Sequence, residues 1–140
     1  MRRVAQGSDV FGRPAVLTHA EARFIVAEQL AQAGVEADIL LEPERRDSAA
    51  AVAVAALHAA AQDPQGVVLI LAADHVIGDT GAVVDAVRAA AVGARAGAIM
   101  TLGIEPTGPA TAYGYIRRGQ PLSGAPGAYA VERFVEKPDR

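Results

Sequence analysis

The chain has 140 residues, of which 51% are hydrophobic and 21% are charged, and its formal net charge is −3. These values are typical of one folded domain, and they give no electrostatic reason to bind nucleic acid or an anionic membrane. The absence of cysteine excludes a disulfide framework and thiolate zinc sites. Since no stretch has the pattern of a signal peptide or a transmembrane helix, we expect a soluble, cytoplasmic protein.

Apolar runs and helix-forming segments alternate along the first hundred residues, about one strand and one helix for every 30 residues. That alternation is typical of a parallel sheet built from crossover connections. In chain order we expect strands at Pro14–Thr18, Ala37–Leu41, Val67–Leu71 and Gly97–Ile104, separated by helices at about 20–33, 49–61 and 81–95.

After Ile104 the helices stop, and two further strands at Tyr113–Arg117 and Ala128–Glu136 are expected to pair locally. The predicted fold class is therefore α/β, a three-layer Rossmann-like arrangement with a mixed sheet. We expect the chain to form one domain.

Residues at the helix boundaries support this order. Gly34 is the expected stop of the first helix. The helix starts are assigned to Thr18 with Glu21 as a capping box, to Asp47 or Ser48, and to Asp79 or Thr80. The apolar stripe of the first helix, expected to face inward, is assigned to Phe24, Ile25, Ala27, Gln29 and Leu30. The inner side of the last helix is expected to carry Val83, Val84, Val87, Ala90 and Ala91.

Asp74 is the first candidate for chemistry. It follows the five large aliphatic residues Val67–Leu71 and two alanines, at the carboxyl end of a strand expected to be buried on both faces. A carboxylate there suits Mg²⁺, which takes few protein carboxylates and shares its shell with phosphates. Aspartate is also a common turn residue, so both interpretations stay open. His75 is a poor magnesium ligand, and His58, in mid-helix, is most simply structural.

The segment after the second strand also lies at the expected ligand edge. Glu42 has two acceptor oxygens that match the N1–H and N2–H donors of guanine. Arg46 is able to reach a phosphate. A solvated, charged turn explains the same residues, so this signal is weak by itself.

Two further stretches suit a sugar phosphate. Glu136 is suited to sugar hydroxyls, and Lys137 supplies a point charge for a phosphate. Gly114, in the sequence Tyr113-Gly114-Tyr115, either eases a bend or lets a backbone N–H approach a sugar ring. Charged strand ends are common, so these residues also have a purely structural explanation.

Taken together and in this order, the stretches resemble the bacterial mannose-1-phosphate guanylyltransferases (GDP-mannose pyrophosphorylases). Some members of that family also carry a mannose-6-phosphate isomerase domain. The matching text is R-F-I-V-A-E-Q-L at Arg23–Leu30, I-L-L-E-P at Ile39–Pro43, A-D-H-V-I at Ala73–Ile77, G-I-E-P-T at Gly103–Thr107, Y-G-Y-I at Tyr113–Ile116 and F-V-E-K-P-D at Phe134–Asp139.

The resemblance implies a nucleotidyltransferase with a glycosyltransferase-A-like Rossmann fold. Mannose 1-phosphate would attack the α-phosphorus of GTP and give GDP-mannose and pyrophosphate. Asp74 would hold Mg²⁺, and Asp74 and Lys137 would be the catalytic residues. The substrate-binding residues implied are Glu42, Pro43, Arg46, Ser48, Gly114, Tyr115 and Glu136. The oligomeric state stays open, with a homo-oligomer as one option.

The chain departs from the family pattern in several places. The glycine-rich loop that cradles the triphosphate and the later half of the domain are absent, so we expect a partial nucleotidyltransferase domain without turnover of its own. Asp47 and Ala112 replace the residues usual in the family. Two alternatives therefore stay open, which are a non-catalytic nucleotide- or sugar-phosphate-binding module, and a nucleotidyltransferase for another sugar and nucleotide.

Overall fold

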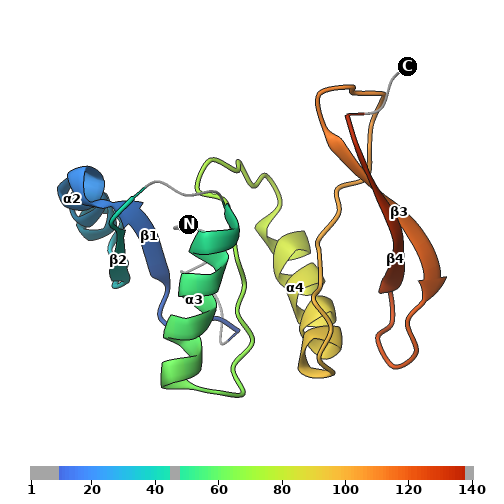
Figure 1. Ribbon diagram of the computed structural model, residues 1–140, viewed down its shortest axis with the longest axis horizontal. Helices are drawn as coiled ribbons and strands as arrows, with labels where there is room; N and C mark the ends of the chain where they lie inside the picture. The colour runs from blue at the N-terminus through green and yellow to red at the C-terminus, as the bar shows by residue number, and fades with distance from the viewer. Residues whose placement is uncertain (1–9, 45–47, 138–140) are drawn as a thin grey trace. The chain divides into compact units, whose positions relative to one another are not determined.

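The computed structural model describes residues 10–44 and 48–137 (Figure 1). The chain divides into two compact units, Met1–Val84 and Asp85–Arg140, and each is described by itself. The elements are β1 (Ala15–His19), a 3-10 helix η1 (Ala20–Ala22), α2 (Arg23–Ala33), β2 (Asp38–Glu42), α3 (Ser48–Gln62), α4 (Thr80–Arg95), β3 (Gly114–Pro121) and β4 (Tyr129–Glu136).

The first unit is built on a parallel strand pair. Strands β1 and β2 run in register from Ala15 opposite Asp38 to His19 opposite Glu42. Helix α2 connects them, and the strand pair lies between α2 and α3 (Figure 1). This β-α-β arrangement confirms the expected parallel pairing of the first two strands.

Helix α2 ends as expected but does not begin as expected. Gly34 adopts the left-handed conformation, with φ of 65°, and its N–H bonds to Ala31 O. Thr18 was expected to cap the helix, but it lies inside β1, and neither η1 nor α2 has a side-chain cap. The expected capping box is therefore wrong, because strand pairing continues to His19 and the helix starts after the 3-10 turn.

The inward face of α2 also differs from the expected one. Phe24 and Ile25 are 70% and 56% exposed, so the prediction was wrong for these two residues. Leu30 is half-buried as expected, and Val26, four residues before it, is half-buried too. Phe24 lies under the Arg23 guanidinium, with 4.3 Å between the guanidinium carbon and the ring centroid.

Helix α3 is attached to the strand pair by a polar contact at the amino end of β2. The Oδ2 atom of Asp38 lies 3.3 Å from His58 Nε2, and the Nε atom of Arg13 lies 2.9 Å from Asp38 Oδ1. Gln62 Nε2 lies 2.8 Å from the same imidazole nitrogen. The structural role expected for His58 therefore has a specific partner in Asp38. The helix ends at a turn in which Gly66 N–H bonds to Asp63 O at 3.0 Å.

Two expected strands do not form paired strands. Residues 67–72 and 98–104 have no assigned strand within the described chain. Val67 and Ile70 are 43% and 48% exposed, and Ile99 and Ile104 are 98% and 91% exposed. The apolar runs have no neighbouring strand among the described residues to complete their backbone hydrogen bonds, so composition alone does not make them strands.

Helix α4 follows the sequence prediction closely. The carboxylate of Asp79 accepts a hydrogen bond from Ala82 N at 3.0 Å, which is a typical N-cap. The half-buried or buried face of the helix consists of Thr80, Val83, Val84, Val87, Ala90, Ala91, Gly93 and Ala94, which includes all five expected positions. At the end of the helix, Gly93 is buried and packs against Met100.

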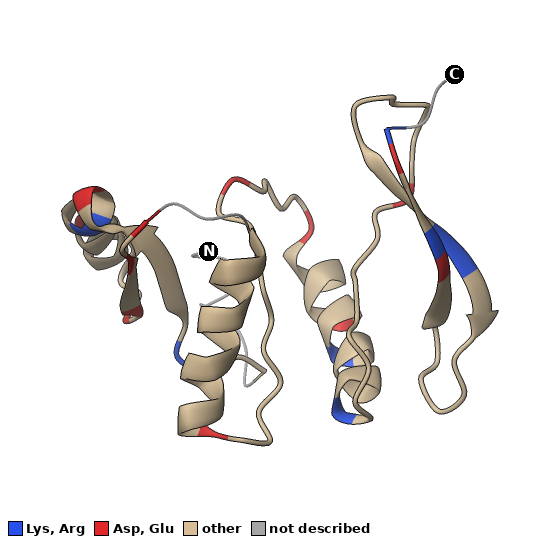
Figure 2. Ribbon diagram, in the orientation of Figure 1, with Lys and Arg blue, Asp and Glu red and all other residues tan. Residues whose placement is uncertain are grey.

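The second unit contains an antiparallel hairpin of β3 and β4, as expected. Gly114 lies opposite Glu136, and Arg117 lies opposite Arg133. The register shifts after Arg117, so the ladder is irregular toward the connecting loop. Figure 2 shows basic residues of both strands near the middle of the hairpin, and Arg117 Nε lies 3.2 Å from Glu132 Oε2.

The structure is a mixed α/β chain with a short parallel and a short antiparallel sheet, which agrees with the expected fold class. In the described ranges, none of the helices is both long and apolar enough to cross a membrane.

Candidate functional site

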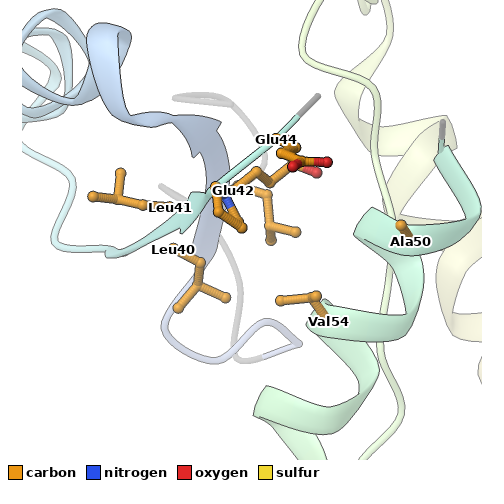
Figure 3. Close-up of a pocket in the computed structure, with 8 residues that line it drawn as sticks. Leu40, Leu41, Glu42, Glu44, Ala50 and Val54 are labelled. Atoms are coloured by element: carbon orange, nitrogen blue, oxygen red, sulfur yellow. The ribbon is translucent and has the colours of Figure 1, made fainter. Parts of the chain in front are cut away.

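A pocket of about 350 Å³ opens between the strand pair and α3 (Figure 3). It lies at the carboxyl end of β2, the end at which ligands bind in parallel sheets. The residues that line it are Leu17, Leu40, Leu41, Glu42, Pro43, Glu44, Ala50 and Val54.

The walls of this pocket follow from strand register and helix periodicity. Leu17 and Leu40 are paired across β1 and β2, so both side chains lie on one face of the strand pair. Ala50 and Val54 are four residues apart and therefore share one face of α3. Figure 3 shows Val54 pointing toward the strands, whereas Leu41 points to the opposite side.

The pocket brings together two of the residues predicted to bind substrate, Glu42 and Pro43. Glu42 is half-buried at the last position of β2, and Pro43 follows it. An apolar wall accepts the flat face of a base, while a carboxylate at its rim accepts N–H donors. Ser48 is the exposed first residue of α3, and Arg46 lies outside the described residues, as does Asp47.

Sequence reasoning did not identify Leu17, Ala50 and Val54 as pocket residues. Their separation in sequence hides their proximity, because only the pairing of β1 with β2 and the packing of α3 bring them together. The spacing of Ala50 and Val54 was the one available signal, since residues four apart share a helix face.

Asp74 lies in a turn at residues 73–74 and is exposed, as is His75. Across residues 10–44 and 48–137, no group of three or more His, Cys, Asp or Glu side chains is arranged to hold a metal ion. A single exposed carboxylate is a hard oxygen donor, so it fits Mg²⁺ that is shared with substrate phosphates rather than enclosed by protein. The donor chemistry of Asp74 therefore fits the ion in this shared form.

Gly114 and Glu136 meet at the open end of the β3–β4 hairpin. They are paired in register, and a Cβ atom built on Gly114 would lie 2.7 Å from Glu136 Oε2. That distance is shorter than any ordinary contact, so only glycine lets the carboxylate occupy this place. The two residues form one small polar site with an accessible backbone.

Lys137 follows directly and has an unusual backbone. Its φ is 42°, which is rare for a residue with a side chain, and its N–H bonds to Tyr113 O at 3.2 Å. Its Nζ atom lies 3.8 Å from Glu136 Oε1, and both side chains are largely exposed. The ammonium and the carboxylate are thus adjacent and open to a ligand.

Tyr115 differs from the other candidates because its hydroxyl already has partners. The oxygen accepts a hydrogen bond from Ala110 N at 2.7 Å and donates one to Ala110 O at 3.0 Å. Gly114, Tyr115, Glu136 and Lys137 therefore belong to one part of the second unit, while Glu42, Pro43, Ser48 and Asp74 belong to the first.

A pocket at the carboxyl end of parallel strands is the usual position of a ligand site in an α/β protein. A family model described as nucleotidyl transferase matches residues 4–140, and the chain belongs to this family. Its mixed α/β architecture is consistent with the Rossmann-like fold of nucleotidyltransferases.

Curated relatives cover most of this chain. It is 50% identical over 127 residues to the xanthan biosynthesis protein XanB of Xanthomonas campestris pv. campestris (strain B100). It is 47% identical over 131 residues to a mannose-1-phosphate guanylyltransferase of Escherichia coli (strain K12), and 49% identical over 130 residues to the mannose-1-phosphate guanylyltransferase ManC of Salmonella typhimurium (strain LT2).

These alignments cover 89–90% of this chain, but only 26–27% of the length of the relatives. The chain therefore spans about a quarter of the proteins that it matches. No solved structure matches the chain. Nucleotidyl transferases generally use a divalent metal ion.

Proposed function

We propose that this chain carries the base-binding and sugar-phosphate-binding segments of a mannose-1-phosphate guanylyltransferase, which makes GDP-mannose and pyrophosphate from GTP and mannose 1-phosphate. The observation that carries the proposal is the pocket at the end of β2, in which Glu42 and Pro43 face an apolar wall. Its position and chemistry suit a purine base with N–H donors. The relatives named as mannose-1-phosphate guanylyltransferases supply the particular nucleotide and sugar. We place the reaction in the cytoplasm, in keeping with the cysteine-free sequence.

The reaction needs alignment and charge neutralisation more than covalent catalysis. An oxygen of mannose 1-phosphate attacks the α-phosphorus of GTP, and the bond from that phosphorus to the pyrophosphate oxygen breaks. The attacking phosphate is already ionised, so no side chain has to remove a proton from it. Asp74 would hold Mg²⁺, and the ion would neutralise negative charge on the phosphates when bound.

The sugar end of the reaction is assigned to the hairpin. The Glu136 carboxylate accepts hydrogen bonds from sugar hydroxyls, and the Lys137 ammonium neutralises the sugar phosphate. Gly114 leaves room for the carboxylate and exposes backbone to the sugar ring. The ion pair between Lys137 Nζ and Glu136 Oε1, which are 3.8 Å apart, keeps the two charges adjacent before any ligand binds.

Nucleotide preference tests the base-binding assignment. We expect GTP to raise the melting temperature of the protein more than UTP or dTTP does in a thermal-shift assay with Mg²⁺. In Glu42→Gln the advantage of GTP should fall by about tenfold in apparent affinity, because an amide group replaces one of the two acceptor oxygens. Glu36→Gln is the matched control, since the Glu36 side chain is 92% exposed and lies two residues before the start of β2, away from the pocket. Equal shifts with all three nucleotides would point to another nucleotide or to a different site.

The role of Asp74 is tested by Asp74→Asn in an enzyme that contains this segment. The substitution keeps the size of the side chain but removes the charge that holds a cation. Activity should fall by at least about a hundredfold at saturating Mg²⁺ if the carboxylate holds the ion. Activity within a few-fold of the unsubstituted enzyme would show that Asp74 is only a turn residue.

A further inference from the structure

The hydroxyl of Tyr115 closes a small ring of backbone. It accepts from Ala110 N at 2.7 Å and donates to Ala110 O at 3.0 Å, and both residues are half-buried. A tyrosine hydroxyl has only one hydrogen to donate, and Ala110 O takes it. Tyr115 is therefore unable to donate a hydrogen bond to a sugar while this ring is closed.

This hydrogen-bonded ring, closed between Ala110 and Tyr115, fixes the turn that leads into β3. It encloses residues 111–114, and inside it the carbonyl of Tyr113 accepts a hydrogen bond from Lys137 N at 3.2 Å. The aromatic ring of Tyr115 lies opposite Val135 in the strand register, and both side chains are half-buried. Gly114 is thus held by the tyrosine hydroxyl on one side and by the strand ladder on the other.

The position of this turn matters because it sets the contact between Gly114 and the Glu136 carboxylate. An added Cβ atom on Gly114 would lie 2.7 Å from Glu136 Oε2, so the carboxylate lies directly against the glycine. A shift of the turn by a fraction of an ångström would change what the carboxylate and the adjacent Lys137 present to a ligand. The hydroxyl of Tyr115 connects the loop before the turn to this site.

We propose that Tyr115 is a positioning residue for the sugar phosphate, whose hydroxyl locks Ala110 to β3 and so holds Gly114 against the Glu136 carboxylate. This inference rests on the proposed function, and it changes the role expected for Tyr115 from direct contact to positioning. Loss of the hydroxyl weakens binding of mannose 1-phosphate and leaves binding of the nucleotide unchanged.

The hydrogen-bonded closure between the Tyr115 hydroxyl and Ala110 is tested without any ligand, by amide hydrogen exchange in NMR. Tyr115→Phe keeps the aromatic ring but removes both hydrogen bonds to Ala110. We expect the Ala110 amide to exchange about three- to tenfold faster, as for the loss of a neutral hydrogen bond. Tyr129→Phe is the matched control, because Tyr129 lies in β4 with its ring 5.1 Å from the Arg118 guanidinium carbon. An unchanged exchange rate in Tyr115→Phe would overturn the proposal.

The positioning role is tested by titrating the same two variants with mannose 1-phosphate and, separately, with GTP. Binding is followed at the Gly114 amide for the sugar phosphate and at the Glu42 amide for the nucleotide. In Tyr115→Phe the dissociation constant for the sugar phosphate should rise by about three- to tenfold, with that for GTP unchanged. A parallel loss for both ligands, or no loss for either, would show that Tyr115 is merely structural.

The two experiments separate the inference from the function on which it rests. If mannose 1-phosphate does not perturb Gly114 in the unsubstituted protein, the proposed function fails at the sugar end and the positioning role fails with it. The exchange rate of Ala110 still decides whether the hydroxyl closes the ring. Faster exchange together with unchanged sugar-phosphate affinity contradicts the positioning role alone.

Discussion

Gly114 is the residue at which one added methyl group has the clearest expected effect. In Gly114→Ala the new Cβ would lie 2.7 Å from Glu136 Oε2, so the carboxylate has to turn away. The Glu136 side chain is 75% exposed and has room to turn, so the hairpin stays folded. We expect the affinity for mannose 1-phosphate, measured by calorimetry, to fall by about tenfold or more, as for a lost hydrogen bond to a charged group.

Gly103→Ala is the control for that change, because nothing lies within 4 Å of a Cβ atom built there. It should bind mannose 1-phosphate as the unsubstituted protein does. Equal affinities of Gly114→Ala and Gly103→Ala would show that the Glu136 carboxylate takes no part in binding.

At the residue scale, the sequence indicated which residues share the pocket only in part. Glu42 was predicted from its place after a strand and Pro43 from the family resemblance, and the structure gives them a common pocket. Val54 was missed, because its contact with the strands depends on how α3 packs. The hydrogen bonds of Tyr115 to Ala110 were also missed, since the four intervening residues give no sign that the chain turns back on itself.

At the scale of elements, the contact between β2 and α3 rests on Asp38 and His58. Their side chains are 33% and 30% exposed and lie 3.3 Å apart. Replacing either residue by alanine should destabilise the first unit by about 1 kcal/mol, the usual contribution of one such hydrogen bond. Urea unfolding followed by circular dichroism gives the free energies.

The double variant Asp38→Ala/His58→Ala shows whether the two residues act through each other. We expect it to be less destabilised than the sum of the single variants by about 0.5–1 kcal/mol. Strict additivity would mean that the 3.3 Å contact does not stabilise the packing of α3.

A second element-scale prediction concerns the glycine inside α4. Alanine in a helix interior is normally more stable than glycine by about 1 kcal/mol. At Gly93 the added Cβ atom would lie 2.7 Å from Met100 Sδ, so the gain should be cancelled by crowding. In the Met100→Ala background the gain of about 1 kcal/mol should appear. The same change in thermal stability in both backgrounds would contradict close packing of Met100 on Gly93.

Elements with local signals were predicted well, and those that need distant partners were not. Asp79, Gly34 and the valines of α4 act within a few residues, and each behaves as expected. Val67–Leu71 has the composition of a buried strand, but a strand also needs a neighbour for its backbone groups. Thr18 failed as a cap for a related reason, because pairing with β2 extends β1 past it.

At the scale of the whole molecule, the two compact units should unfold separately. Tyr113, Tyr115 and Tyr129 are the only tyrosines, tryptophan is absent, and all three lie in the second unit. Tyrosine fluorescence therefore reports the second unit, whereas the helical circular dichroism comes mainly from α2, α3 and the start of α4 in the first unit. We expect the two probes to give different urea midpoints. Coincident midpoints would instead indicate one cooperative unit.

We propose that this chain carries the substrate sites of an enzyme that makes GDP-mannose. The most direct measurement replaces the matching segment of the Escherichia coli relative, which is 47% identical over 131 residues, with this chain. The purified chimera is then given Mg²⁺, mannose 1-phosphate and either GTP or UTP. We expect GDP-mannose and pyrophosphate from GTP, and at least about tenfold less product from UTP. A folded chimera that makes no GDP-mannose, or that uses UTP equally well, would contradict it.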